Sequence, residues 1–96
     1  MLTDRDRKRH EHKAEKGKVI KFIIQYEIFF EGKWVPVVRY DTVHGYVQKD
    51  LMDADGSEEK ILLGEADLNE ALTLGDLDIN MNWEIYKERY FRRIKR

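Results

Sequence analysis

The sequence predicts a single α+β domain in which a four-stranded antiparallel β-meander is covered on one face by a long C-terminal helix. Three observations lead to this fold class. Residues 19–30 alternate in hydropathy with a period of two, short strand-like segments follow without a crossover helix, and residues 68–94 carry apolar side chains at helical spacing. Consecutive strands without crossover helices pair as an antiparallel sheet.

Composition restricts the chemistry that the chain can carry. Its 96 residues fit one domain, and 42% hydrophobic residues are enough for a compact core. The absence of cysteine excludes disulfides, thiolate metal sites and thiol nucleophiles. We expect a cytoplasmic protein with no membrane contact, no metal and no cofactor. Charged residues reach 39% and the only glutamines are Gln25 and Gln48, a composition typical of thermophiles.

The N-terminal segment, residues 1–18, is predicted to be a charged lead-in that is helical or frayed. Leu2 and Ala14 are its only clear apolar residues after Met1, so it offers no face to bury. His10 and His12 lie in this segment, and solvated histidines are a better interpretation of them than metal ligands. The single α+β domain is therefore expected to span residues 19–96.

The first predicted strand is residues 19–30, because β-branched and aromatic residues alternate along it. Glu31-Gly32-Lys33 supplies a turn, and residues 34–40 form the second strand of a hairpin. Pro36 cannot donate a ladder hydrogen bond, so it predicts an edge or a β-bulge.

Two registers are open for this hairpin. A two-residue turn places Val35, Val37 and Arg39 on the face of the buried residues of the first strand. A three-residue or bulged turn instead places Trp34, Val38 and Tyr40 there, and leaves Arg39 with Gln25 and Glu27 on the other face. We prefer the second register, because it collects the larger side chains on one face.

Two further strands and a helix complete the fold. Residues 46–52 and 58–63 are the strands, separated by the turn cluster of residues 53–57. Asp67 and Glu70 form a capping pattern that begins a helix. We expect this helix to continue through Gly75. Its core face is predicted from residues at three- and four-residue steps: Leu68, Leu72, Gly75, Ile79, Trp83, Tyr86, Tyr90 and Ile94.

A second apolar stripe lies on another face of the same helix. Its members are Leu74, Leu77, Met81 and Ile85. An apolar face beyond the one that covers the sheet indicates a contact with another molecule, such as a twin subunit. The sequence thus predicts a small interaction module that forms a homo-oligomer.

Charge is segregated along the chain. Residues 1–18 carry seven Lys/Arg and four Asp/Glu, residues 81–96 carry six and two, and the segment between them is acidic. Mutual attraction within one fold accounts for this pattern. The alternative is that the two basic ends form one surface for phosphate or for an acidic partner.

The segment of residues 34–50 contains the candidate catalytic residues. His44 can exchange a proton near neutral pH, Asp41 can fix its tautomer, and Arg39 can hold a phosphate through two hydrogen bonds. Tyr40 or Tyr46 can stack on a base. These are the groups of a metal-independent ribonuclease. The structural interpretation, which we favour, is that Asp41 and His44 close a connection between strands.

The same residues carry a resemblance. The motif W-x-P-V-V-R-Y-D-T-x-H-G in residues 34–45, with the N-W-x-x-Y pattern beginning at Asn82, resembles a small uncharacterised prokaryotic domain family over roughly residues 20–90. More distantly, the Y-D-x-x-H-G part is similar to TumE-type toxins of toxin–antitoxin pairs. That similarity implies RNA as substrate and an antitoxin-like protein partner. Gln48 stands where such sequences often carry another histidine, and glutamine cannot act as an acid–base group.

Overall fold

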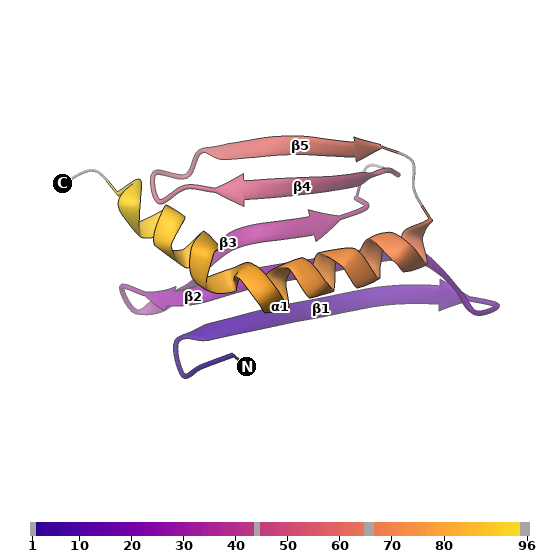
Figure 1. The fold of residues 1–96 in the computed structure, drawn as a ribbon, viewed down its shortest axis with the longest axis horizontal. Coiled ribbons are helices and arrows are strands. Elements are labelled where there is room, and N and C mark those ends of the chain that lie inside the picture. The colour runs from indigo at the N-terminus through magenta and orange to yellow at the C-terminus, as the bar shows by residue number, and fades with distance from the viewer. Residues whose placement is uncertain (1, 44, 65–66, 95–96) are drawn as a thin grey trace.

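In the computed structural model of the chain, a five-stranded antiparallel sheet packs against one helix (Figure 1). The structure describes residues 2–43, 45–64 and 67–94. The strands run in chain order across the sheet, each paired with its neighbour. The elements are β1 (Asp6–Glu15), β2 (Lys18–Phe30), β3 (Lys33–Asp41), β4 (Val47–Met52), β5 (Glu58–Gly64) and α1 (Leu68–Arg92).

The expected α+β class, antiparallel sheet and C-terminal helix are confirmed. The predicted number of strands, four, is wrong, because the sheet has five. Residues 6–15, expected in a helical or frayed lead-in, form β1 at the edge of the sheet. Lys16 and Gly17 both have positive φ and make the tight turn into β2. Because β1 is almost entirely charged, its strand conformation comes from backbone pairing with β2 and not from an apolar face.

The hairpin of β2 and β3 combines the two registers that the sequence left open. Glu31 and Gly32 form a two-residue turn with positive φ, so Val35 pairs with Ile28 near the turn. A bulge beside Pro36 then shifts the register, and Tyr40 pairs with Ile24 farther along. The preferred placement of Tyr40 is therefore confirmed, whereas Trp34 lies opposite Phe29 and not on the Ile28 face.

Pro36 can lie in the central strand β3 because neither β2 nor β4 requires a hydrogen bond from a backbone N–H at this position. It lies at the bulge on the β2 side, and the β4 pairing of β3 runs only from Val38 to Asp41. The bulge decides which β3 side chains face the helix.

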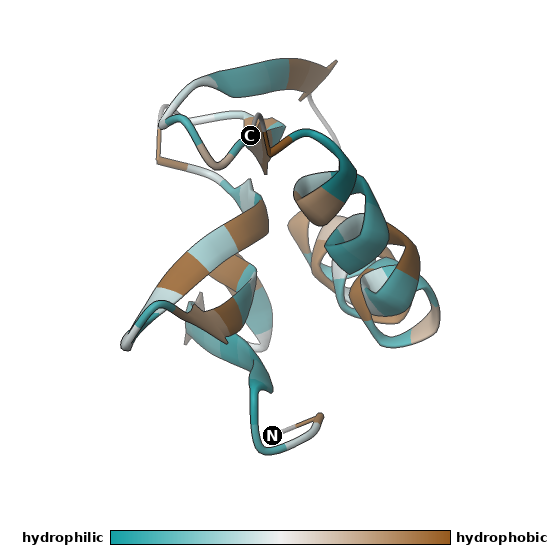
Figure 2. Ribbon diagram, turned by 90° about the vertical axis from the view of Figure 1, so that its left-hand side faces the viewer, coloured by the Kyte–Doolittle hydropathy of each residue, from teal (hydrophilic) through white to brown (hydrophobic). Residues whose placement is uncertain are grey.

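Helix α1 runs without a break through Gly75, as expected, and Asp67 caps its start by accepting hydrogen bonds from the Asn69 and Glu70 amides. It contacts β2, β3 and β4, and forms a separate layer on one side of the sheet (Figure 2). Gly75 permits this close packing, since a Cβ there would lie 3.1 Å from Cγ of Tyr40. We call the covered side of the sheet the helix face and the uncovered side the open face.

The core lies between α1 and the helix face. The fully buried residues of the two layers include Ile24, Tyr26, Val38 and Ile79. The expected core side of α1 is confirmed: Gly75, Ile79 and Tyr90 are buried, and Leu68, Leu72, Trp83, Tyr86 and Ile94 pack against the cluster. No helix among the described residues is both long and apolar enough to cross a membrane.

Candidate functional site

A hydrogen-bonded cluster joins α1 to β3 and β4 beneath the helix. Tyr40 and Tyr86 both donate their hydroxyl hydrogens to Asp78 of α1, the latter over 2.5 Å. Lys49 of β4 donates to the Tyr86 hydroxyl over 2.7 Å, and its ammonium lies 3.7 Å from Asp78. Burial raises the pKa of Asp78, but these donors and the lysine outweigh it and leave the pKa below its ordinary value. Burial and the bond to Asp78 raise the pKa of Tyr40. We call this cluster a clamp, because its two neutral tyrosines and its charged pair of Lys49 and Asp78 hold the helix in one orientation on the sheet.

A second clamp ties β1 to the rest of the domain. The carboxylate of Asp6, which is buried, accepts hydrogen bonds from Tyr26 of β2 over 2.6 Å and from Lys87 of α1 over 3.2 Å. Thr3 also donates to it. Farther along β1, Lys8 donates to Asp76 over 2.5 Å and to Asn80 over 2.7 Å. These contacts tie the charged strand β1 to the helix.

The open face carries a polar row that crosses all five strands in register. One residue comes from each strand, and neighbours in the row are paired positions: Arg9, Gln25, Arg39, Asp50 and Lys60. Arg39 donates through Nε to Gln25 over 2.8 Å, and its Nη1 lies 3.9 Å from Asp50. Lys60 donates to the other oxygen of Asp50 over 3.4 Å. Asp50 is fully buried, so the basic side chains of Arg39 and Lys60 lie over a buried carboxylate.

The neighbouring part of the open face repeats this arrangement. Glu27 is buried and accepts a hydrogen bond from Nε of Arg7 over 2.5 Å, while Arg9 lies 3.6 Å away. The guanidinium of Arg7 also stacks over the Trp34 ring at 4.2 Å from its centroid. The charged side chains of this face are therefore largely paired with one another.

The structure separates two of the candidate catalytic residues. Arg39 points to the open face, whereas Tyr40 points to the helix face, is buried, and is held by Asp78. Tyr40 thus has no free ring face for a base. Asp41 is buried and accepts a hydrogen bond from the Val43 amide over 3.1 Å, which closes the bend after β3. His44, the proposed acid or base, lies outside the described residues.

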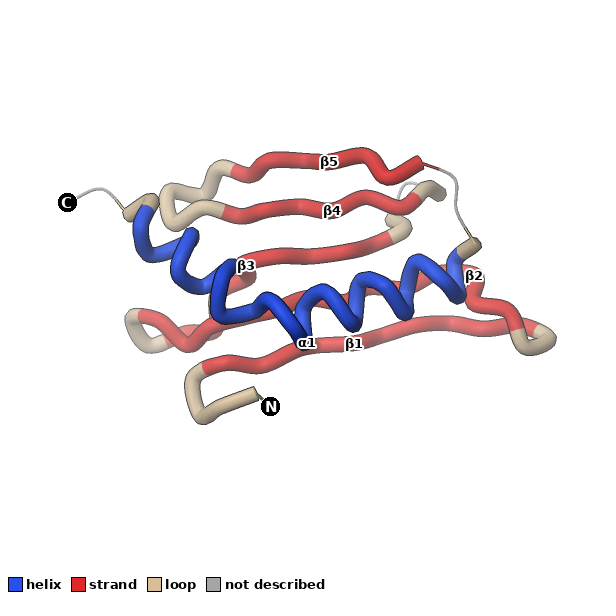
Figure 3. The backbone as a smooth tube through the Cα atoms, viewed as in Figure 1, coloured by secondary structure: helices blue, strands red, loops and turns tan. Residues whose placement is uncertain are grey.

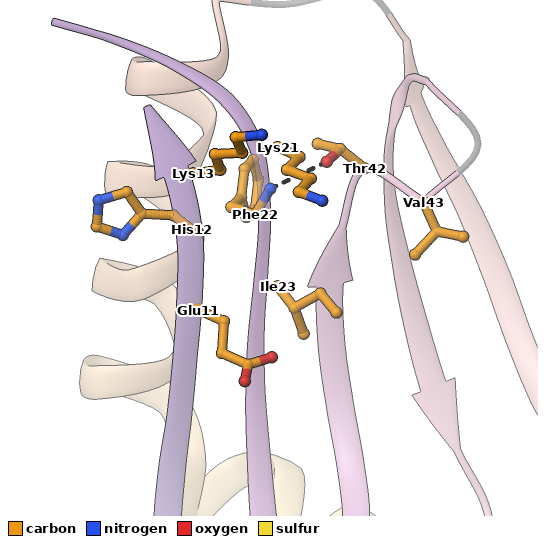
Figure 4. A pocket seen from close by; sticks show the side chains of 8 residues that line it. All are labelled: Glu11, His12, Lys13, Lys21, Phe22, Ile23, Thr42 and Val43. Atoms are coloured by element: carbon orange, nitrogen blue, oxygen red, sulfur yellow. Dashed lines mark hydrogen bonds between the residues drawn. The ribbon is translucent and has the colours of Figure 1, made fainter. Parts of the chain in front are cut away.

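A cavity of about 440 Å³ lies at the end of the sheet beside this bend (Figure 4). Lys13 and Lys21, which are paired across β1 and β2, line it together with Thr42 and Val43. The backbone amide of Phe22 donates to the Thr42 hydroxyl over 3.0 Å. This hydrogen bond holds together the part of the cavity wall that these two residues form. No group of three metal-binding side chains occurs in the part of the chain that the structure describes.

The outer side of α1 carries a line of exposed apolar side chains. Leu74, Leu77, Met81 and Ile85, the predicted second stripe, are exposed by 57%, 50%, 71% and 61%. We call these four residues the outer stripe. Their steps of three and four residues place them along one line of the helix, opposite to buried Ile79. Burial of this stripe requires another surface.

Sequence reasoning missed several residues that organise these sites. Asp78, Lys49 and Asp50 carry no local pattern that distinguishes them from other charged residues. Their roles depend on pairing between elements that lie far apart in the chain. The only available signals were the alternation that placed Asp50 and Lys49 on opposite faces of one strand, and the helical spacing of Asp78 and Tyr86.

Comparison with known proteins finds one matching family model. A family model described as a domain of unknown function (DUF7718) matches residues 1–96. Comparison with curated proteins and with solved structures finds no match. The family match agrees with the expected uncharacterised small domain family. The W-x-P-V-V-R-Y-D-T-x-H-G motif as its signature and the similarity to TumE-type toxins stay predictions.

Proposed function

The chain belongs to the DUF7718 family of domains of unknown function, and from that premise we propose that it is a self-associating interaction module whose interface is the outer stripe of α1. The exposure of all four stripe residues carries this proposal. Monomeric proteins rarely leave a contiguous apolar line of this kind in water, because each side chain gains free energy when it is buried.

The charges along α1 favour a second copy as the occupant. Asp67 caps the start of the helix, Glu70 lies in its first turn, and Arg92 lies in its last turn beside Arg89, which is held by Asp53 of the same chain. An antiparallel pair therefore brings opposite charges and opposite helix-dipole ends together, whereas a parallel pair brings like charges together.

The spacing of the stripe fits the same arrangement. One two-fold axis near residues 79–80 places Leu74 beside the partner's Ile85 and Leu77 beside the partner's Met81. The same axis places Asp67 beside the partner's Arg92. Apolar and charged residues are thus matched by a single symmetric contact, as a two-fold dimer requires.

Met81→Glu is expected to abolish the contact through the outer stripe, because it places a charge at the most exposed residue of the stripe, close to the two-fold axis. We expect an affinity loss of at least about tenfold. Sedimentation equilibrium over a concentration series measures the mass and the dissociation constant. Val43→Glu is the matched control, since Val43 is exposed by 66% but lies off the helix. A wild-type chain that stays monomeric at every concentration overturns the proposal, as does an assembly whose mass is unchanged by Met81→Glu.

A metal-independent ribonuclease that uses His44, Arg39 and Asp41 is the second candidate. The cavity beside Val43 supports it, because Lys13 and Lys21 occupy paired positions of β1 and β2 and both line it, while Arg39 lies in the neighbouring strand β3. Like charges at paired positions repel, and a phosphate between them removes that repulsion. Tyr40 has no part in this version, since its hydroxyl and ring are buried.

This candidate predicts RNA cleavage that resists chelators and is lost in His44→Ala. Lys21→Glu should weaken RNA binding and reduce its salt dependence. Fluorescence anisotropy with single-stranded RNA and a cleavage assay measure the two effects. Lys33→Glu, which makes the same change of charge at an exposed position by the β2–β3 turn, away from the cavity, is the control. Cleavage that needs added Mg²⁺, or that survives His44→Ala, excludes this mechanism.

A further inference from the structure

β1 and β5 are the two edges of the sheet (Figure 3). Their side chains differ sharply in chemistry. The β1 edge has charged or histidine side chains at every position of the strand except Ala14. Such an edge resists pairing with another strand, because pairing would desolvate these charges. The β5 edge instead has three consecutive apolar residues, Ile61, Leu62 and Leu63.

These three residues present apolar surface on both sides of the edge. Leu62 pairs with Gln48 and lies on the open face, where it is exposed by 67%. Ile61 pairs with Lys49 and lies on the helix face. Leu63 is the bulged residue of β5, opposite the step from Val47 to Gln48; it is exposed by 46% and lines a groove with Leu74 of α1.

The outer backbone groups of β5 have no strand beside them in the part of the chain that the structure describes. β5 is the last strand of the sheet, and its ladder runs only to β4. An edge with unpaired N–H and C=O groups and apolar side chains on both faces is a template for strand addition. Helix α1 does not cover it, because α1 lies over β2 and β3 (Figure 1).

We propose that β5 pairs in antiparallel orientation with β5 of a second copy, so that two domains share one continuous ten-stranded sheet. The strand is self-complementary about a two-fold axis through Leu62. That register places Leu62 opposite the partner's Leu62 on the open face. It places Ile61 opposite the partner's Leu63 on the helix face, twice by symmetry.

Other symmetric registers match the residues less well. An axis through Ile61 places Leu63 opposite the partner's Glu59 and Leu62 opposite the partner's Lys60. The axis through Leu62 leaves Lys60 opposite the partner's Gly64, so its ammonium keeps its contacts with Asp50 and Glu58, at 3.4 and 2.9 Å. The second copy therefore buries apolar surface without breaking an ion pair.

This interface is separate from the outer stripe of α1 and does not depend on the proposed function. Both contacts are two-fold, and two different two-fold contacts on one chain build a tetramer or a longer assembly. The β5 edge would then link the dimers that the outer stripe forms.

The test places Leu62→Lys in the Met81→Glu background, where the outer stripe is disabled. We expect Met81→Glu to sediment as a dimer through β5, and the double variant to sediment as a monomer. Val43→Lys, at an exposed apolar position of similar exposure away from the edge, should leave the Met81→Glu dimer intact. Circular dichroism verifies that each variant is folded, and Leu62 tolerates lysine because most of its side chain is in water.

Amide hydrogen exchange distinguishes strand pairing from a contact between side chains alone. The amides of residues 58–64 should become protected as concentration rises, and Leu62→Lys should remove that protection. A Met81→Glu chain that is monomeric at every concentration overturns the β5 proposal but supports the α1 interface. A dimer whose mass and β5 protection are unchanged by Leu62→Lys also overturns it. A wild-type monomer overturns both.

Discussion

Ile79→Ala is expected to lower the free energy of unfolding by about 3 kcal/mol, whereas Ile85→Ala on the same helix should lower it by less than about 0.5 kcal/mol. Ile79 is fully buried against the helix face of the sheet, so its truncation leaves a cavity among well-packed neighbours. Ile85 lies six residues later on the outer stripe and is exposed. The two substitutions remove the same atoms from opposite sides of α1.

Urea denaturation at a concentration where the chain is monomeric measures both values. Wild type and variants should share one m-value, since the surface exposed on unfolding hardly changes. Ile85→Ala should in addition weaken dimer formation, which sedimentation detects. Equal losses of stability in the two variants would contradict the assignment of the two helix sides, and with it the outer stripe.

Asp6→Ala is expected to cost about 3 kcal/mol at neutral pH, a large effect for a residue in an edge strand. The substitution leaves the Tyr26 hydroxyl buried without its acceptor and removes the partner of Lys87. Asp4→Ala, two residues earlier at an exposed position, is the matched control and should be nearly neutral. Thermal or urea unfolding of the three proteins makes the comparison.

The cost of Asp6→Ala should shrink in acid. Burial raises the pKa of Asp6, but the hydrogen bonds from Thr3, Tyr26 and Lys87 outweigh it, so the pKa lies below the ordinary 3.8. A depressed native pKa means that the stabilisation is complete above the unfolded value and is lost as pH falls through the native one. Wild type and variant should therefore converge in stability below about pH 4. A difference that stays constant from pH 7 to acid would contradict the ionic role of Asp6.

Much of the fold follows from local patterns. Alternation in residues 19–30 predicted β2 and Gly32 predicted the turn, both of which the structure contains. Pro36 predicted an edge or a bulge, and the structure has the bulge in a central strand. Three- and four-residue spacing predicted both the core side of α1 and the exposed outer stripe. These patterns succeed because each records which side chains one element buries, and burial repeats with the geometry of that element.

The sequence alone missed β1 for a physical reason. Its residues carry no apolar alternation, because β1 meets the helix through ion pairs such as Lys8 with Asp76. The one local signal was Lys16-Gly17, a two-residue turn that joins β1 to β2. A charged strand is recognised only when its partner strand is known.

The sequence by itself therefore determined the α+β class, the central hairpin, the helix and the existence of a second apolar stripe. Only the tertiary structure decided that Arg39 and Tyr40 face opposite sides, that Asp6 and Asp78 clamp the layers, and that β5 is an apolar edge. The first group depends on contacts within one element, which spacing along the chain records. The second depends on which strands are neighbours and where a bulge shifts their register, and those are properties of pairing between distant segments.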